Sequence, residues 1–298
     1  MTLPEHQYER LTTIRRFEET LLELFSQGKL VGTTHTYIGQ EADAVGVIAH
    51  LDRERDVVFS NHRCHGHYIA FTDDLYGLLC EVMGKPDGVC GGKGGSQHLC
   101  NGNFYSNGVQ GSIVPVATGI ALAEKQKRSG AVTAVFLGDG TLGQGTVYEC
   151  LNMASLWQLP LLFVVENNEY AQTTPRRLAM AGSFVQRAQA FGVATDELDT
   201  TDVAEIHEAA GQAVARVRET GEPFFLVLHT YRYSPHSKGD DHRDPAEIEE
   251  RRRRDPLLVA GARLTAEQRR AIEEACERRL AETIEAAERA PSATPELV

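Results

Sequence analysis

The stretch from Ala131 to Tyr170, AVTAVFLGDGTLGQGTVYECLNMASLWQLPLLFVVENNEY, decides the fold of this chain. It opens with an apolar, β-branched run that ends in the glycine-rich turn 138–143, and such a run is typical of a buried parallel strand. A helical pattern of apolar residues covers 144–157, and a second buried run covers 161–165. The stretch therefore predicts a strand, a turn, a helix and a second strand.

The glycines of the turn also fit a dinucleotide-binding site. Gly138, Gly140 and Gly143 have the spacing G-x-G-x-x-G, and Glu166 lies near the position of a ribose-binding acid. Asp139 argues against this interpretation, because its carboxylate would repel a pyrophosphate unless a cation lay between them. The turn is therefore better suited to a diphosphate that is bound through a metal ion.

Residues whose oxygen atoms could bind such an ion come directly after the two predicted strands in the sequence. Asp139 comes after the first strand and Asn168 after the second, and the backbone carbonyl of Tyr170 offers a third oxygen. Mg²⁺ prefers oxygen ligands and retains diphosphate oxygens among them. We therefore predict that Asp139, Asn168 and Tyr170 bind Mg²⁺.

The same residues carry a family resemblance. Gly138-Asp139-Gly140 followed by Asn167-Asn168 resembles the thiamine-diphosphate signature, which is G-D-G, a spacer of about thirty residues and N-N. The segment between them, from Tyr148 to Pro160, resembles the alpha subunit of the decarboxylating component of 2-oxoacid dehydrogenases, in the transketolase-like superfamily. The resemblance implies that thiamine diphosphate and Mg²⁺ are the cofactors, with contacts from Gly138, Asp139, Gly140, Thr141, Asn168 and Tyr170.

Length and pattern predict the architecture. A chain of 298 residues can bury one large core. Strands and helices that alternate as far as Pro223–Leu228 predict an α/β fold, with a mainly parallel sheet flanked by helices. We expect a single thiamine-diphosphate-binding domain over 1–298, with a helical N-terminal arm over 1–50, a helical C-terminal extension over 245–298 and a loose tail from Pro291.

Composition excludes several classes of function. The net charge of −12 argues against binding to nucleic acid, and the one dense basic run, Arg251–Arg254, is surrounded by acids. No run approaches the ~18 apolar residues of a membrane span, and the N-terminus is too polar for a signal peptide. The six cysteines include no C-x-x-C pair. We therefore expect a cytoplasmic protein with reduced thiols.

The segment from Asn61 to His67 follows a short predicted strand, 57–60, and is rich in histidine. A zinc site is one interpretation, but no matching Cys/His pair follows downstream. Arg63 suits a diphosphate better, because its planar guanidinium binds phosphate oxygens in pairs, and the family holds the cofactor's phosphate here. We predict that His62 and His65 line the phosphate and substrate sides, with a catalytic role for His65, and that His67 is structural.

Two further loops contain glycine. The run Gly91–His98 fails as a Walker motif, because a glycine follows Lys93 where Ser or Thr should stand. The run is either a flexible lid or a place where two backbone segments pass close to each other. The family has a similar stretch near its active site, which makes His98 a candidate site residue. In the family, backbone groups near Gly108 and Gln110 contact the aminopyrimidine ring. For His35, a surface position and a site role remain equally open.

The polar loop from His229 to Asp241 is too long for a simple connector, and such loops are often functional. It resembles the family's active-site loop, Y-R-Y-H-G-H-S, whose final histidine reaches the reacting carbon. His236 is that residue here, which makes it a catalytic and cofactor-binding candidate. Ser234-Pro235 replaces His-Gly, and 238–241 differs from the pyruvate pattern, so the donor substrate stays open.

The sequence offers no carboxylate that could activate the aminopyrimidine. The resemblance implies that the beta subunit of an α₂β₂ heterotetramer supplies a glutamate, and that a lipoyl carrier domain accepts the acyl unit cleaved from a small 2-oxoacid. The first alternative is a two-chain enzyme that transfers a C2 ketol unit from a ketose phosphate. The altered loop at Ser234-Pro235 motivates this alternative. The second, a non-catalytic partner, is disfavoured because Asp139, Asn168, Arg63 and His236 are all present.

Overall fold

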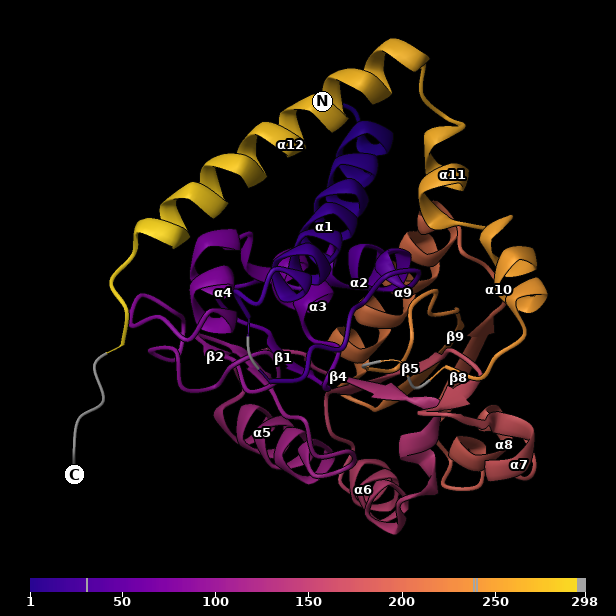
Figure 1. Ribbon diagram of the computed structural model, residues 1–298. Coiled ribbons are helices and arrows are strands. Elements are labelled where there is room, and N and C mark those ends of the chain that lie inside the picture. The colour runs from indigo at the N-terminus through magenta and orange to yellow at the C-terminus, as the bar shows by residue number, and fades with distance from the viewer. Residues whose placement is uncertain (31, 238, 240, 294–298) are drawn as a thin grey trace.

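The computed structural model describes residues 1–30, 32–237, 239 and 241–293, and its centre is a seven-stranded sheet (Figure 1). The strand order is β2-β3-β1-β4-β5-β9-β8, and every pairing is parallel except that of β2 with β3. The strands are β1 (Val57–Ser60), β2 (Cys100–Asn101), β3 (Phe104–Ser106), β4 (Thr133–Gly138), β5 (Leu161–Asn167), β8 (Ala194–Leu198) and β9 (Phe224–His229). The predicted α/β fold with a mainly parallel sheet is confirmed.

Helices cover both faces of this sheet (Figure 1). One face carries α1 (Leu3–Ser26), α2 (Glu41–Ile48), α3 (His65–Thr72), α4 (Leu75–Val82), α9 (Val203–Thr220) and α12 (Ala266–Arg289). The other carries α5 (Ile113–Lys127), α6 (Gly145–Leu156) and α8 (Phe184–Gln189). The shorter elements are η1 (Asp139–Gly143), β6 (Tyr170–Ala171), β7 (Thr174–Pro175), α7 (Arg176–Ala179), α10 (Pro245–Arg252) and α11 (Pro256–Gly261).

Burial on both faces explains why the central strands are continuously apolar. Along β5, Leu162 and Val164 pack into the core beneath α1 and α9, whereas Phe163 and Val165 pack into the core beneath α5 and α6. Successive side chains of a strand point to opposite faces, so neither set can be polar when both faces carry helices. This requirement produces the two apolar runs that identify β4 and β5 in the sequence.

Some elements were not predicted. Strand β8 lies at the edge of the sheet and contains Asp196 and Glu197, both exposed, so it lacks the apolar signal of a central strand. Helix α3 begins at His65, inside the polar segment that we assigned to the end of β1. Of the predicted tail, Thr294–Val298 lie outside the described residues.

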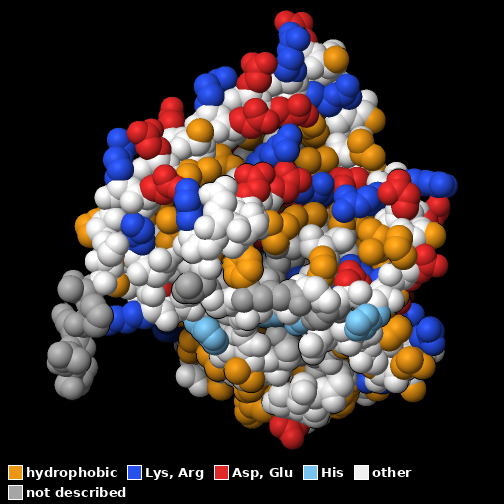
Figure 2. Space-filling view, in the orientation of Figure 1, with side chains coloured by type: hydrophobic (Ala, Val, Ile, Leu, Met, Phe, Trp, Pro, Cys, Tyr) orange, Lys and Arg blue, Asp and Glu red, His pale blue; other side chains and the backbone are white. Residues whose placement is uncertain are grey.

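The outer surface differs between the two layers of helices. Figure 2 shows charged side chains of both signs over α1 and α12, and apolar side chains gathered over α5 and α6. The exposed large apolar residues on these two helices include Val116 and Leu156, which are 55% and 71% exposed. Over the described residues, none of the helices is long and apolar enough to span a membrane.

The parallel strands bring polar residues to one edge. β1, β4 and β5 lie side by side, and their carboxyl ends lead into Asn61, Asp139 and Asn168. In open α/β sheets, ligands bind beyond this edge of the strands. The fold therefore places segments from distant parts of the sequence around one cavity.

Candidate functional site

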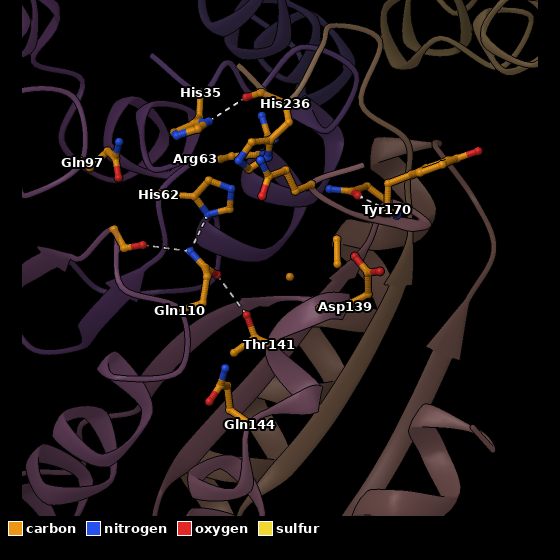
Figure 3. A pocket seen from close by; sticks show the side chains of 16 residues that line it. His35, His62, Arg63, Gln97, Gln110, Asp139, Thr141, Gln144, Tyr170 and His236 are labelled. Carbon is orange, nitrogen blue, oxygen red and sulfur yellow. Dashed lines mark hydrogen bonds between the residues drawn. The ribbon is translucent and has the colours of Figure 1, made fainter. Parts of the chain in front are cut away.

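A cavity of about 350 Å³ opens beyond the carboxyl ends of β1, β4 and β5 (Figure 3). Its lining comes from seven separate segments of the chain: His35, His62, Arg63, Gln97, Gly108, Gln110, Gly138, Asp139, Gly140, Thr141, Gln144, Asn168, Tyr170, Ala171, Gln172 and His236. Every site residue that we predicted from the sequence is in this set except His65 and the candidate His98. His35, whose role was open, also lines the cavity.

Asp139 is held at the start of the one-turn helix η1, directly after β4. Its side chain is only 4% exposed, and burial raises its pKa to about 6. Gly140 allows the turn to pass close to β6, because a Cβ at this position would lie 2.6 Å from the Cβ of Ala171. The turn thus presents a buried carboxyl group whose charged form lacks the solvation that water provides.

Asn168 lies beside this carboxyl group with its amide fixed by two contacts. Its Nδ2 donates to Oε1 of Gln40 at 3.1 Å, and its Oδ1 accepts from the backbone nitrogen of Tyr170 at 3.2 Å. Between them, Glu169 has a φ of +69°, a left-handed conformation that is uncommon for a residue with a side chain. These constraints hold an amide oxygen and the Tyr170 backbone at the strand end, next to Asp139.

Arg63 is a buried cation without an ion pair. It is 3% exposed, and it donates from Nη1 to the backbone oxygen of Thr36 at 2.8 Å and from Nη2 to Nδ1 of His236 at 3.0 Å. Its Nε has no partner, and no carboxylate of the described chain lies within ion-pair distance. Burial, and next the charge of Arg232, lowers its pKa to about 9. The site therefore holds positive charge that a bound anion would neutralise.

The contacts of Gln110 define the tautomer of His62. Nε2 of Gln110 lies 3.2 Å from the backbone oxygen of Gly108, which only accepts, so this atom is the amide nitrogen. The same nitrogen donates to Nδ1 of His62 at 2.7 Å, while Thr141 donates to Oε1 of Gln110 at 3.0 Å. Burial, followed by the charge of Arg63, holds the pKa of His62 well below its usual range. His62 is therefore neutral and carries its proton on Nε2.

Three histidines meet in the cavity, with one ring nitrogen of each within 4.8 Å of the others: His35, His62 and His236. A zinc ion would need a lone pair from every ring. The Nδ1 lone pair of His236 accepts from Arg63, and that of His62 accepts from Gln110. The charge of Arg63 further disfavours a cation, so this cluster is better suited to hydrogen bonding than to metal binding.

Arg243 holds the backbone of the loop that carries His236 through hydrogen bonds. Its Nη1 donates to the oxygen of Arg232 at 2.6 Å, and its Nη2 donates to the oxygen of Ser234 at 2.9 Å. The guanidinium also lies 5.1 Å from the ring centroid of Tyr231. Lys238 and Asp240, in the stretch that departs from the pyruvate pattern, lie outside the described residues.

The structure does not bring His65 into the cavity, so its predicted catalytic role is not carried further. Its side chain is fully buried in α3, with Nδ1 3.2 Å from both Glu18 oxygens and Nε2 3.0 Å from the Ser96 oxygen. The reason is the helix itself, which turns His65 toward α1. His67, which we predicted to be structural, is fully buried, and its Nε2 lies 3.0 Å from Oε1 of Glu166.

The glycine-rich run is organised by a buried carboxylate that we did not predict. Glu81 of α4 is 0% exposed and accepts hydrogen bonds from four backbone nitrogens, those of Cys90, Gly92, Gly94 and Gly95, at 2.6, 2.9, 2.6 and 3.0 Å. Backbone nitrogens that converge in this way form an anion-binding concavity. The run is therefore a close backbone approach, and His98 is exposed and does not line the cavity.

We expect Glu81→Gln to destabilise the fold by about 3 kcal/mol, because an amide can satisfy only part of these donors and hydrogen bonds to a charged acceptor are strong. Urea unfolding followed by circular dichroism measures this change. Glu149→Gln on the exposed face of α6 is the matched control and should leave the free energy of unfolding unchanged. Equal stability of both variants would show that the four contacts contribute little.

Several residues of the site were not predicted. Gln40 holds Asn168, Gln97 and Gln144 line the cavity, and Ala171 limits the turn at Gly140. The only sequence signal for Gln97 is its place within the glycine-rich run Gly91–His98. Gln40 stands in the motif Gly39-Gln40-Glu41-Ala42, but its partner is 128 positions away. Sequence spacing does not reveal such a pairing.

Comparison with known proteins identifies the family. A family model described as "Dehydrogenase E1 component" matches residues 9–296. The chain is 41% identical over 265 residues to the alpha subunit of acetoin:2,6-dichlorophenolindophenol oxidoreductase of Cupriavidus necator, covering 87% of this chain and 79% of the relative. It is 42% identical over 240 residues to the pyruvate dehydrogenase E1 component subunit alpha of Zymomonas mobilis, covering 79% and 68%. The chain therefore belongs to the dehydrogenase E1 component family, as an alpha subunit of its thiamine-diphosphate-dependent enzymes.

Proposed function

We propose that this chain is the alpha half of an α₂β₂ enzyme in which it binds the diphosphate of thiamine diphosphate through Mg²⁺. The assembly cleaves a small 2-oxoacid and passes the acyl unit to a lipoyl carrier. One observation carries the proposal, namely that Asp139, Asn168 and Arg63 converge on a single cavity although they come from three different strand ends.

The donor set suits Mg²⁺. Asp139 and Asn168 offer side-chain oxygens from adjacent strands, and Tyr170 offers a backbone carbonyl just beyond them. Burial disfavours the charged form of Asp139, and a divalent cation would restore it. Magnesium accepts such oxygens together with those of a phosphate. The side chains of this chain therefore fit the metal that the cofactor requires.

Arg63 suits the diphosphate. Its guanidinium is buried, its Nε has no partner, and it has no ion pair with the described residues. An arginine fork binds phosphate oxygens with short, charge-assisted hydrogen bonds. Arg63 would therefore gain an anionic partner in the bound state that the chain alone does not provide.

Thiamine diphosphate, when bound, supplies the carbon nucleophile and the electron sink for cleavage next to a ketone. The role of His236 is proton transfer or hydrogen bonding at the substrate oxygen. Because Arg63 donates to Nδ1 of His236, a neutral His236 carries its proton on Nε2. This geometry makes His236 a hydrogen-bond donor toward the cavity that it lines.

The partner completes the site. Asp139 is the only acid that lines the cavity in the described chain, and we assign its carboxylate to the metal. A second acid is needed to activate the aminopyrimidine, and we assign it to a glutamate of the beta subunit. Val109, next to the cavity residue Gln110, is 61% exposed, and exposed apolar residues on α5 and α6 extend this surface. Such apolar area is typical of a subunit interface.

Calorimetric titration tests the proposal. Thiamine diphosphate is titrated into the chain alone and into the chain with its beta subunit, each with and without Mg²⁺. We expect tight binding only when beta subunit and metal are both present. Tight binding to the isolated chain without metal would contradict the proposal.

The donor substrate that the enzyme turns over distinguishes this function from its alternative. Reconstituted enzyme is assayed with pyruvate, acetoin and a ketose phosphate. Turnover of the 2-oxoacid supports the first function, whereas turnover of the ketose phosphate alone would favour ketol transfer. The altered Ser234-Pro235 pair, in the loop that Arg243 fastens, motivates this comparison. The cytoplasmic location remains a prediction from the sequence.

A further inference from the structure

The turn that carries Asn168 and Tyr170 depends on the residue between them. The left-handed backbone of Glu169 is unfavourable for a residue with a side chain, so the surrounding contacts must impose it. Its backbone nitrogen donates to Oδ1 of Asn167 at 3.1 Å, and its backbone oxygen accepts from the nitrogen of Arg176 at 2.8 Å. Its carboxyl oxygens accept from Nδ2 of Asn167 at 2.7 Å and from Nε of Arg176 at 3.1 Å. Asn167 and Arg176 together therefore fix this turn.

The same turn lies close to Asp139. Helix α7, which begins at Arg176, packs against the one-turn helix η1, which begins at Asp139. Burial is the main reason why the pKa of Asp139 is raised to about 6, and the charge of Glu169 raises it further while that of Arg176 lowers it. A displacement of Glu169 would therefore change both the geometry and the charge around the proposed metal ligands.

His229 orients the side-chain amide of Asn167. Asn167 is the last residue of β5, His229 is the last residue of β9, and the two stand opposite each other in the parallel sheet. Because the backbone nitrogen of Glu169 only donates, the atom of the Asn167 amide that it contacts is the oxygen. The amide nitrogen then donates to Nδ1 of His229 at 2.8 Å as well as to Glu169, so both of its hydrogens are used.

Glu197 holds the other side of the His229 ring. Nε2 of His229 lies 2.9 Å from Oε1 of Glu197, on the edge strand β8. Because Nδ1 accepts from Asn167, a neutral ring carries its proton on Nε2 and donates it to this carboxyl group. A chain of hydrogen bonds thus runs from the edge of the sheet to the turn at Glu169, although neither His229 nor Glu197 lines the cavity.

We propose that His229 is a positioning residue for the metal, because it orients the Asn167 amide that holds the turn with Asn168 and Tyr170. The inference rests on the proposed function and adds a residue to its metal site. Groups that orient metal ligands without touching the metal contribute to its affinity, and their loss lowers that affinity by roughly 10- to 100-fold. Nδ1 is the atom that carries this role, since Nε2 contacts Glu197 instead.

Three substitutions separate the two contacts of His229. His229→Leu removes both. His229→Gln places an amide near the position of Nε2, so it keeps the contact with Glu197 and loses that with Asn167. His229→Asn places an oxygen near the position of Nδ1, so it keeps the acceptor for Asn167. His207→Leu is the matched control, because His207 is a half-buried histidine of α9 that does not line the cavity.

Calorimetric titration of thiamine diphosphate into the assembled enzyme, at increasing concentrations of Mg²⁺, gives the metal concentration for half-maximal binding. We expect His229→Leu and His229→Gln to raise this concentration about tenfold or more. His229→Asn should restore most of the loss, and His207→Leu should leave the value unchanged. At saturating Mg²⁺ every variant should bind the cofactor nearly as tightly as the unmodified enzyme, because Arg63 is intact.

The outcomes separate this inference from the proposed function. An unchanged metal requirement in His229→Leu, with or without a lower unfolding temperature, would overturn the inference. An equal rise in all three His229 variants would overturn it too, because packing of the ring and not its Nδ1 would then matter. The proposed function stands in both cases if Asp139→Ala abolishes metal-dependent binding. An unmodified enzyme that binds the cofactor equally tightly without Mg²⁺ would overturn both.

Discussion

Asp139→Ala should abolish the magnesium-dependent binding of thiamine diphosphate to the assembled enzyme, with a loss of affinity of at least about 100-fold. Substitution of groups that only support a metal ligand lowers metal affinity by roughly 10- to 100-fold, and a direct ligand should contribute more. The variant loses the only acidic side chain lining the cavity in the described chain. Without it, no protein charge offsets that of the metal at the diphosphate.

The measurement is calorimetric titration of the cofactor at several concentrations of Mg²⁺. Asp196→Ala is the matched control, because Asp196 is exposed on the edge strand β8. We expect the control to bind as the unmodified enzyme does. If Asp139→Ala bound the cofactor equally tightly and with the same dependence on Mg²⁺, the metal would have to lie elsewhere.

Arg63→Met should affect stability and binding in opposite directions. A buried charge without an ion pair is unfavourable, and its replacement by an apolar side chain of similar length should raise the free energy of unfolding by about 2 kcal/mol. The same change should weaken binding of thiamine diphosphate by at least about 100-fold, because the diphosphate loses a desolvated cation. A residue with a purely structural role would not give this pair of results.

Urea unfolding of the chain and titration of the assembled enzyme measure the two effects separately. Arg216→Met, on the exposed face of α9, is the control for the loss of one positive charge. Arg63→Lys keeps the charge without the planar fork and should recover only part of the affinity. Destabilisation by Arg63→Met together with normal cofactor binding would contradict the anion role.

Most of the diphosphate side of the site could be predicted from the sequence. Asp139 and Asn168 directly follow the strands β4 and β5, and Arg63 lies three residues after β1. Parallel strands bring their carboxyl ends to one edge of the sheet. The alternation of side chains along a strand and the length of a connection can both be read from neighbouring residues. The sequence therefore indicates where these three residues stand relative to the strand ends. The resemblance to a known family added His236, which lies in a loop without regular spacing.

His65 does not line the cavity, and the reason is physical. Its neighbours His62 and Arg63 belong to the loop after β1, but His65 already belongs to α3. A helix turns successive side chains to different sides, and here it directs His65 to Glu18 on α1. The sequence shows a cluster of histidines, whereas the helix boundary decides which of them face the cavity.

The sequence by itself determined the two strands on either side of the turn at Asp139, the positions of the proposed oxygen ligands, and the family. Only the tertiary structure decided how the polar groups are oriented. Gln110 defines the proton position of His62, Gln40 orients Asn168, and Gly108 leaves room for Gln97. Apolar periodicity is written into neighbouring residues, but the direction of a hydrogen bond depends on atoms that only the folded chain brings together.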